Sequence, residues 1–280
     1  MRKLNPKQYV EAEFNKLIFT QTSRIKSHLQ LQTADITNVK FRFTDYESNQ
    51  KALENLSSST YVKTSDEYKS LFGLYDSVSQ DTENIKKEIK KISEVKCPYC
   101  GISEPSHLDH FLPRAKYPEF SIYAPNLIYV CSICNSTYKR DDVITSTGER
   151  KFFNPYFDDF IETTQFLKCV VELNGDVYPS FKFYIQDLSA TMPYEYSVMK
   201  NHFEAMELQN RYIDQIVKEK FRRFKNRYVQ KDISIEQLKH NIDYELEGLD
   251  CENINNWEKV FWESLKDSDE CLNLIVKNVI

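Results

Sequence analysis

Apolar residues along this chain recur mainly at helical spacing, with charged residues between them. This spacing predicts helices over 7–31 and 81–92 in the first third of the chain. Toward the other end it predicts a long helix from about 194 to 229 and two further helices over 235–247 and 256–279. Both ends of the chain are therefore expected to be helical.

Three shorter stretches break the helical pattern. Apolar and polar residues alternate over 40–44, which predicts a short strand or an extended segment. The run of serine and threonine over 57–60 predicts a loop. Two β-rich runs within 165–185 meet at Asn174-Gly175, a dipeptide that favours a tight turn, so a β-hairpin is expected. We expect this hairpin to extend the sheet of the central segment.

Composition supports a mainly helical chain around a small mixed centre. Only 5 of the 280 residues are glycine and 28% are charged, a composition that favours helices. The expected fold class is α+β, mostly helical, with two strands and a helix at the centre. The patterns define a helical segment over 1–94, a core over 95–155, a hairpin extension over 156–190 and a helical segment over 191–280.

Two cysteine pairs give the sequence its most specific chemical signal. Two residues separate Cys97 from Cys100 and Cys131 from Cys134, and thirty residues lie between the pairs. This spacing is typical of zinc knuckles, and turn-forming residues accompany the first pair. Four thiolates fill the tetrahedral shell of Zn²⁺ and leave no position for water, so a structural zinc is expected.

The other cysteines and the apolar content bear on location. Cys169, Cys251 and Cys271 show no pairing pattern, which favours a reducing cytoplasm. The first residues lack the apolar core of a signal peptide. No run approaches the ~20 apolar residues that span a bilayer. A cytoplasmic protein without a membrane segment is therefore expected.

The residues enclosed by the cysteine pairs suit phosphodiester hydrolysis. His110 belongs to the residue type that titrates near neutral pH, so it is the natural base to activate a water. Asp109 offers a hard oxygen ligand for Mg²⁺ or Mn²⁺, which would stabilise charge on the phosphate. Neighbours on a strand point to opposite faces, so both act at one site only where the backbone bends or the metal lies at the strand edge.

Together these residues resemble the HNH endonucleases of the ββα-metal superfamily. The resemblance rests on Asp-His-x-x-Pro beginning at Asp109, on Asn126 followed by leucine, and on Cys-x-x-Cys-Asn ending at Asn135. It extends over 97–140. The resemblance implies a zinc-clamped core of two strands and a helix that cleaves nucleic acid with a divalent ion, with DNA as the expected substrate.

The resemblance also implies roles for single residues. His110 corresponds to the general base, and Asn126 to the residue that pins the loop and orients that histidine. Asp109 and Asn135 correspond to ligands of a catalytic Mg²⁺ or Mn²⁺. Asparagine at the last position resembles the HNH domains of RNA-guided nucleases. Lys139 lies four residues after Asn135, where many relatives have lysine three residues after, so its role, including contact with nucleic acid, stays open.

A narrower similarity surrounds the motif. The sequences over 107–114, 117–121 and 154–159 (His-Leu-Asp-His-Phe-Leu-Pro-Arg, Tyr-Pro-Glu-Phe-Ser and Asn-Pro-Tyr-Phe-Asp-Asp) resemble stand-alone bacterial HNH proteins of anti-phage defence. These include the nuclease subunits of Septu-type and retron-associated systems, which act beside an ATPase. The similarity implies a defence role and an ATPase partner.

Charge is unevenly distributed along the chain. A net charge of −5 argues against a globally basic nucleic-acid binder, so contacts with nucleic acid must be local. One predicted helix carries a basic cluster with aromatic residues among its members, formed by Lys218, Lys220, Arg222, Arg223, Lys225, Arg227 and Lys231. This cluster is either a phosphate-binding face or a solvated helix face. The acidic stretch over 243–270 would offset it or face a basic partner protein.

Two classes of function are compatible with these features. The first is a metal-dependent endonuclease, with DNA as the expected substrate and RNA as an alternative. The second is a non-catalytic zinc module that holds nucleic acid or a partner. Taken singly, Asn126 is also a common turn former, and Asn135 a common helix N-cap. The joint placement of these residues between two metal-binding pairs favours the nuclease.

Overall fold

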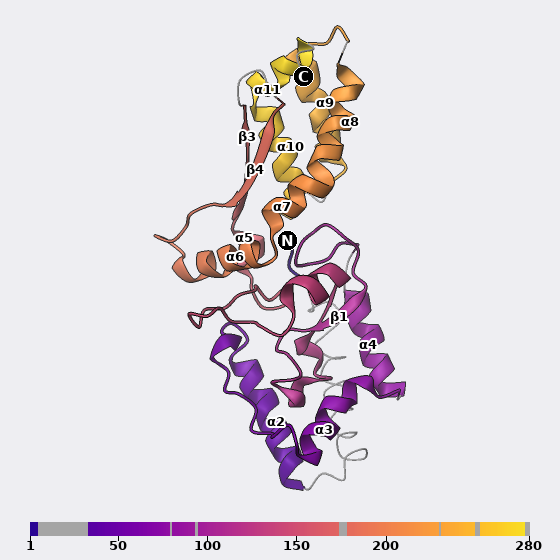
Figure 1. Ribbon diagram of the computed structural model, residues 1–280, viewed down its shortest axis with the longest axis vertical. Helices are drawn as coiled ribbons and strands as arrows, with labels where there is room; N and C mark the ends of the chain where they lie inside the picture. Colours follow the sequence, from indigo (N-terminus) through magenta and orange to yellow (C-terminus); the bar gives the residue numbers. More distant parts are fainter. Residues whose placement is uncertain are drawn as a thin grey trace. The chain divides into compact units, whose positions relative to one another are not determined.

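The computed structural model describes residues 1–4, 33–78, 80–92, 95–173, 178–229, 231–249 and 253–277 (Figure 1). The helix expected over 7–31 and the turn expected at Asn174-Gly175 lie outside the described residues. The chain forms two compact units, Lys3–Asp159 and Phe160–Ile280 with Met1–Arg2. The helical N-terminal segment and the central core thus belong to one unit, and the hairpin and C-terminal helices to the other.

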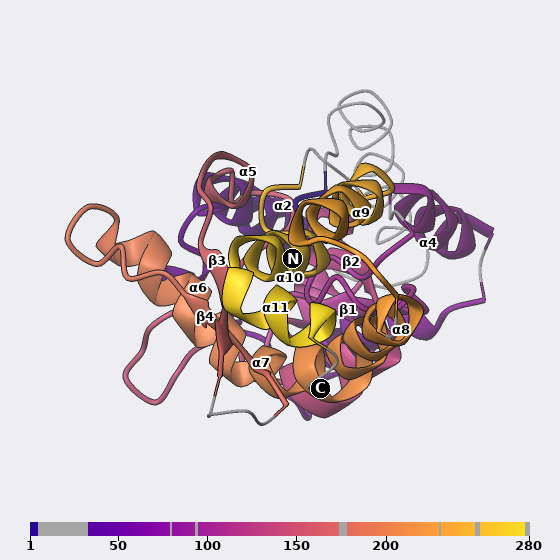
Figure 2. The ribbon, with the colours of Figure 1, turned by 90° about the horizontal axis from the view of Figure 1, so that it is seen from above.

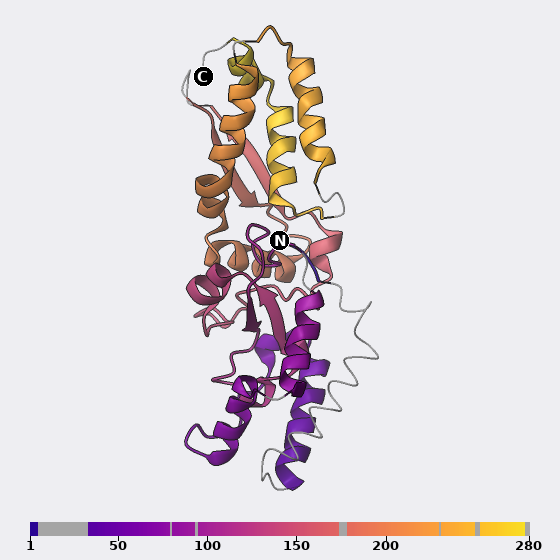
Figure 3. The ribbon, with the colours of Figure 1, turned by 90° about the vertical axis from the view of Figure 1, so that its right-hand side faces the viewer.

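The Lys3–Asp159 unit contains one small sheet surrounded by helices. Its elements are α2 (Thr33–Ser48), η2 (Leu53–Asn55), α3 (Asp66–Gly73), η3 (Leu74–Asp76), α4 (Gln80–Ile92), β1 (His107–His110), η4 (Pro118–Phe120), η5 (Ala124–Asn126), β2 (Leu127–Val130) and η6 (Cys134–Lys139). Strands β1 and β2 are antiparallel, with His107 opposite Val130 and His110 opposite Leu127. Helix α4 contacts β2 and lies beside the strand pair (Figure 3).

Residues 40–44 are helical, so the strand expected there is wrong. They lie inside α2, where Val39, Phe43 and Tyr46 are buried at a spacing of four and three residues. Phe41, which produced the apparent alternation with Phe43, is 67% exposed. The apolar period of this stretch is therefore that of a helix, and one exposed aromatic residue obscured it.

Helix α2 packs on the segment that connects β1 to β2. The Phe43 ring stacks on Tyr123 with centroids 4.2 Å apart, and Tyr46 meets Phe120 edge-on at 5.0 Å. Arg42 is nearly fully buried and donates from Nε to the Glu119 carboxylate at 2.9 Å. These contacts fix the connecting segment, which the next section shows to be part of the candidate site.

The second unit pairs a β-hairpin with helices. Its elements are α5 (Phe160–Thr163), β3 (Leu167–Glu172), β4 (Ser180–Ile185), α6 (Pro193–Ala205), α7 (Leu208–Tyr212), η7 (Ile213–Val217), α8 (Lys218–Tyr228), α9 (Ile235–Glu247), α10 (Trp257–Asp267) and α11 (Asp269–Val276). Helices α10 and α11 lie between the hairpin and helices α8 and α9 (Figure 2).

The hairpin forms its own two-stranded sheet, so the expectation that it extends the central sheet is wrong. Along β4 the side chains of Phe181 and Phe183 are buried and alternate with exposed ones. The Phe181 ring lies 5.1 Å from the rings of Phe221 and Phe261. The apolar face of the hairpin is thus buried by helices of its own unit.

The long helix expected from 194 to 229 is interrupted. Glu207 adopts a left-handed conformation with φ of 49°, which separates α6 from the continuous run of α7, η7 and α8. The helix expected over 235–247 matches α9, which begins with a capping box between Ser234 and Gln237. The last expected helix is divided at Ser268, which caps α11.

The expected class, α+β and mostly helical, is confirmed by these elements. Within the residues that the structure describes, none of the helices combines the length and apolar character needed to cross a membrane.

We predict that Arg42→Met destabilises the Lys3–Asp159 unit by about 3–5 kcal/mol, because it leaves the buried Glu119 carboxylate without its cation. Urea unfolding followed by circular dichroism measures this change. Lys69→Met is the matched control, since Lys69 pairs with an exposed Asp66 and should show no measurable change. Equal stability of the two variants would contradict a structural role for the buried pair.

Candidate metal centre and catalytic site

The first cysteine pair lies in a tight turn that brings both sulfurs together. The Gly101 amide donates to the Cys97 carbonyl at 2.8 Å, and the Cys97 amide donates to the Ser103 carbonyl at 2.8 Å. Gly101 has a φ of 68°, which glycine adopts without steric cost. The Ile102 amide points at the Cys100 sulfur, 3.4 Å away. The turn therefore supplies a donor that stabilises a thiolate.

The second cysteine pair lies where β2 passes into a helical turn. Cys131 directly follows β2, and Cys134 begins η6. The Cys134 amide donates to the Cys131 sulfur at 3.4 Å, so this pair also supplies a backbone donor to one of its sulfurs. The sulfurs of Cys100 and Cys131 are 3.9 Å apart, so the two pairs meet.

The four cysteines form one buried group that could hold a metal ion such as zinc. Their sulfur atoms all lie within 4.8 Å of one another. Burial raises the pKa of the Cys97 thiol, and hydrogen bonds with neighbouring sulfurs raise the pKa of Cys134. If all four were ionised, the thiolates would repel one another at this range unless a cation lay between them. The donor set and the two-residue spacings fit a tetrahedral structural site, as the sequence predicts.

His110 ends strand β1 and is held by a backbone carbonyl. Its Nε2 atom lies 2.7 Å from the Ser121 oxygen. Because a carbonyl only accepts hydrogen bonds, Nε2 carries the proton and Nδ1 has the lone pair. Burial lowers the pKa of His110 to about 4, and the hydrogen bond to Ser121 opposes this shift. The positive charges of Arg114 and Lys139 lower the pKa further. The ring is therefore neutral at pH 7.

Asn126 lies at the end of the segment between β1 and β2 and ties that segment together. Its side chain is fully buried. Its Oδ1 accepts from the Leu112 amide at 2.8 Å, and its Nδ2 donates to the Leu112 and Phe120 carbonyls at 3.0 and 3.4 Å. The Tyr46 hydroxyl also donates to Oδ1, at 3.4 Å. One amide thus fixes both the exit from β1 and the stretch next to Ser121.

The helices before the core hold the same segment from outside. The Ser121 hydroxyl donates to the Leu71 carbonyl in α3 through a short hydrogen bond. The Tyr68 hydroxyl donates to the Ala115 carbonyl at 3.0 Å, and Arg42 of α2 binds Glu119. The carbonyl that orients His110 is therefore anchored by two helices outside the strand pair.

Asp109 lies on the opposite side of β1 from His110 and is enclosed. The residue is only 3% exposed. Its Oδ1 accepts from Lys139 Nζ at 3.0 Å, and its Oδ2 accepts from the Tyr99 hydroxyl at 3.0 Å. Burial raises its pKa, although both donors oppose that shift. Asp109 and His110 therefore do not share one exposed face. This agrees with strand geometry, in which neighbouring side chains point to opposite faces.

Lys139 is buried and connects the helical turn to β1. Its Nζ donates to the His110 carbonyl at 2.7 Å as well as to Asp109, and the residue is 1% exposed. Contact of Lys139 with nucleic acid is not compatible with this burial. The turn η6 is a π-helix in which the Arg140 amide bonds the Asn135 carbonyl at 3.2 Å. A π turn takes in one residue more than an α turn, which accounts for the spacing of four residues between Asn135 and Lys139.

Asn135 and His107 differ from these buried residues. Asn135 is half-buried near the start of η6, and among the described residues its side chain makes no hydrogen bond. His107 begins β1, is exposed and pairs through Nδ1 with the Ser106 hydroxyl at 2.9 Å. His107 is therefore a surface residue in this structure.

The basic cluster on α8 is largely paired with acidic residues of its own unit. Lys218 and Arg223 pair with Asp214 and Glu219 one turn away. Across the unit, Lys220 binds Glu258, and Arg227 binds Glu245 at 3.1 Å. Lys225 lies over the Tyr178 ring at 5.0 Å. These contacts favour the interpretation of α8 as a solvated helix face offset by the acidic stretch.

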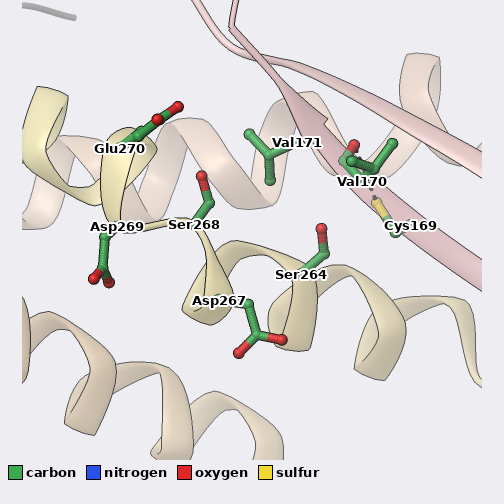
Figure 4. A pocket seen from close by; sticks show the side chains of 8 residues that line it. All are labelled: Cys169, Val170, Val171, Ser264, Asp267, Ser268, Asp269 and Glu270. Carbon is green, nitrogen blue, oxygen red and sulfur yellow. Dashed lines mark hydrogen bonds between the residues drawn. The ribbon is translucent and has the colours of Figure 1, made fainter.

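The second unit also has an open pocket beside the hairpin (Figure 4). It is lined by Cys169, Val170, Val171, Ser264, Asp267, Ser268, Asp269 and Glu270. Asp269 is paired with Lys239 at 2.6 Å, and the Cys169 sulfur points to the backbone of its neighbour Val170.

Several residues of the site carried no recognisable signal in the sequence. Tyr99 lies within the first cysteine pair, where no motif marks it, and its hydroxyl donates to Asp109. Tyr75 of η3 meets the His110 ring edge-on, with centroids 4.7 Å apart. Arg114 lies over Phe72 and near Tyr75. Tyr75 comes from a helix far from the motif, so only the three-dimensional structure reveals its position.

Comparison with known proteins gives limited information. No protein-family model matches the chain, and no solved structure matches it. The chain is similar to protein ea31 of Escherichia phage lambda, with 31% identity over 121 residues. These residues make up 42% of this chain and 39% of the phage protein, so the chain matches well under half of that relative. The similarity is too short to assign a family.

We predict that the purified protein binds one equivalent of zinc and that Cys97→Ser loses it. The loss should unfold or aggregate the Lys3–Asp159 unit, because the four sulfurs join the two strands to the helical turn. Metal analysis and thermal unfolding measure both effects. Cys169→Ser is the control, because Cys169 lies outside the group and should leave zinc content unchanged. A folded, active and metal-free Cys97→Ser variant would refute the metal centre.

Proposed function

We propose that the Lys3–Asp159 unit is a metal-dependent HNH-type endonuclease that hydrolyses phosphodiester bonds in nucleic acid, with DNA as the expected substrate. The observation that supports this proposal most strongly is the state of His110. Its ring is neutral, oriented by the Ser121 carbonyl, and located at the end of a strand next to a four-cysteine group. The order of strand, strand and helical turn agrees with the order that the resemblance implies.

In this proposal His110 accepts the proton of the attacking water. The Nε2 hydrogen bond to Ser121 leaves Nδ1 as the acceptor. A pKa of about 4 keeps that nitrogen available at neutral pH, but it also makes the free imidazole a weak base. A bound phosphate would add negative charge next to the ring and raise the pKa toward the working range. The base would therefore strengthen when the substrate is present.

The residues expected to bind a catalytic ion fit that role only in part. Asn135 is half-buried and its amide oxygen suits Mg²⁺ or Mn²⁺. Asp109 is enclosed, and each of its carboxylate oxygens already accepts a hydrogen bond. An ion bound there would have to share Asp109 with Lys139. When bound, such an ion would stabilise charge on the phosphate and the leaving oxygen.

Asn126 and the outer helices would act by positioning. Asn126 bonds the backbone on both sides of the connecting segment, and Ser121 within that segment orients the base. A hydrogen bond that is displaced by 1 Å would turn the imidazole away from the water. Asn126 is therefore a positioning residue in this proposal and touches no reacting atom.

The second function class stays open to test. A non-catalytic zinc module that holds nucleic acid or a partner would keep the metal group and lose only the chemistry of His110. Cleavage of RNA is the alternative within the nuclease class. We also propose a role in anti-phage defence beside an ATPase partner. This part of the proposal rests only on the sequence resemblance around the motif.

We predict that His110→Ala lowers plasmid nicking by 100-fold or more in Mg²⁺ or Mn²⁺, on the order expected for loss of a positioned base. Zinc content and thermal stability should stay close to those of the parent, because the ring is at a strand end. His107→Ala is the matched control, since His107 is an exposed histidine of the same strand. It should cut at the parent rate.

Two outcomes of that assay would overturn the assignment. Cutting by His110→Ala at the parent rate would remove the proposed base. Retention of nucleic acid by the parent protein without any cleavage, across both metals, would support the binding module instead.

We predict different metal responses for Asn135→Ala and Asn126→Ala. The first should need a higher Mn²⁺ concentration for half-maximal rate, because it removes an ion ligand. The second should lower the maximal rate at an unchanged Mn²⁺ requirement, because it displaces the base. Asp109→Ala is less informative, since it also leaves Lys139 buried without its carboxylate. Identical metal titrations for the two asparagine variants would contradict this division of roles.

A further inference from the structure

Arg114 lies next to the proposed base on a surface made by α3 and η3. Both the His110 ring and the Arg114 guanidinium contact the Tyr75 ring, at 4.7 and 5.2 Å from its centroid. Lys86 of α4 approaches the same ring, with Nζ 4.6 Å from the centroid. Positive charge is therefore concentrated on the aromatic side chain that touches His110.

The Arg114 guanidinium lies against an aromatic ring and does not use all of its hydrogen-bond donors within the described residues. Its CZ atom lies 4.2 Å from the centroid of Phe72, a typical cation–π distance. Its hydrogen bonds within the described residues come from Nη1 alone, to the Phe72 carbonyl at 3.4 Å and to Asp76 at 2.8 Å. Among the residues that the structure describes, the donors on Nη2 and Nε therefore have no partner. A guanidinium with one free edge can bind two oxygens of a phosphate.

Two other arginines of this unit are buried in ion pairs and lack that free edge, whereas Arg140 is exposed and donates from Nε to the Thr137 carbonyl. Arg150 binds Asp158 through both carboxylate oxygens at 2.8 and 2.7 Å, with both side chains nearly fully buried. Arg42 is likewise buried against Glu119. The acidic partner of Arg114 is different, because the Asp76 side chain is 59% exposed. Exposed ion pairs with one hydrogen bond exchange readily for a stronger anion.

We propose that Arg114 binds a backbone phosphate of the nucleic acid at the His110 site, and that Asp76 occupies its guanidinium until the substrate displaces it. This inference rests on the proposed function, since it names the residue that holds the substrate there. It also places a phosphate contact at Arg114, whereas the sequence suggested a phosphate-binding face on α8. The shared ligand chemistry is the phosphodiester backbone, which occurs in both DNA and RNA.

The two members of the pair should respond in opposite directions. Arg114→Gln removes the phosphate contact, so affinity should fall by about three- to tenfold, and the slope of log affinity against log salt should become shallower by about 0.9. Asp76→Asn removes the competing carboxylate, so affinity should rise. A merely structural pair would instead give two losses and no change in salt slope.

The test measures fluorescence anisotropy of labelled DNA and RNA duplexes of one sequence, with the full-length protein carrying His110→Ala so that cleavage does not interfere. Each variant is added to this background and titrated over a range of KCl concentrations. The matched control is Arg223→Gln on α8, because Arg223 also pairs with a single carboxylate, and it should leave affinity and slope unchanged. Zinc content checks that each variant is folded. If Arg114→Gln does not fold, the affinity of Asp76→Asn for the duplex tests the proposal by itself.

The outcomes separate this inference from the proposed function. Lower affinity and a shallower salt dependence in Arg114→Gln, together with higher affinity in Asp76→Asn, support the inference. They do so even if the parent protein cleaves nothing. Unchanged binding in both variants overturns it even if the parent protein cleaves nucleic acid efficiently. Effects in Arg223→Gln equal to those in Arg114→Gln would return the contact to α8 and also overturn it. The preferred duplex identifies which nucleic acid supplies the phosphate.

Discussion

The hydrogen bond from the His110 ring to the Ser121 carbonyl is the interaction on which the proposed chemistry depends. It selects the tautomer and fixes the ring, so that Nδ1 is left as the proton acceptor. Ser121 lies in an irregular segment, which could not hold a carbonyl in place by itself. Asn126 secures that segment from within, and α2 and α3 secure it from outside through Arg42 and the Leu71 carbonyl. The N-terminal helices are thus part of the support of the site.

A second set of contacts joins the metal group to the same strand. Lys139 follows the second cysteine pair in one helical turn and reaches the carboxylate of Asp109 and the carbonyl of His110. Tyr99, within the first cysteine pair, donates to the other oxygen of Asp109. Asp109 is therefore bound from both halves of the cysteine group. A metal held by that group would therefore also keep β1, and with it the proposed base, in place.

Much of the site was predictable from the sequence because its signals are local. The cysteine spacings predicted that the four sulfurs come together, and the helical spacing of apolar residues over 235–247 predicted a helix whose bounds agree with α9. Predictions failed where tertiary contacts decide. Exposure of Phe41 hid the helical period of α2, and the left-handed Glu207 broke a helix that its sequence would continue. The enclosure of Asp109 depends on Lys139, which only a π turn places opposite it.

The most direct test of this account is the protonation state of His110, measured by nitrogen-15 NMR of the imidazole rings as pH is lowered. Comparison with His110→Gln assigns its signals. The account predicts a neutral ring with the proton on Nε2 at pH 7, which becomes charged only as pH approaches the pKa of about 4. A ring protonated on Nδ1, or one already charged at pH 6.5, would contradict the hydrogen bond to Ser121 and the role built on it.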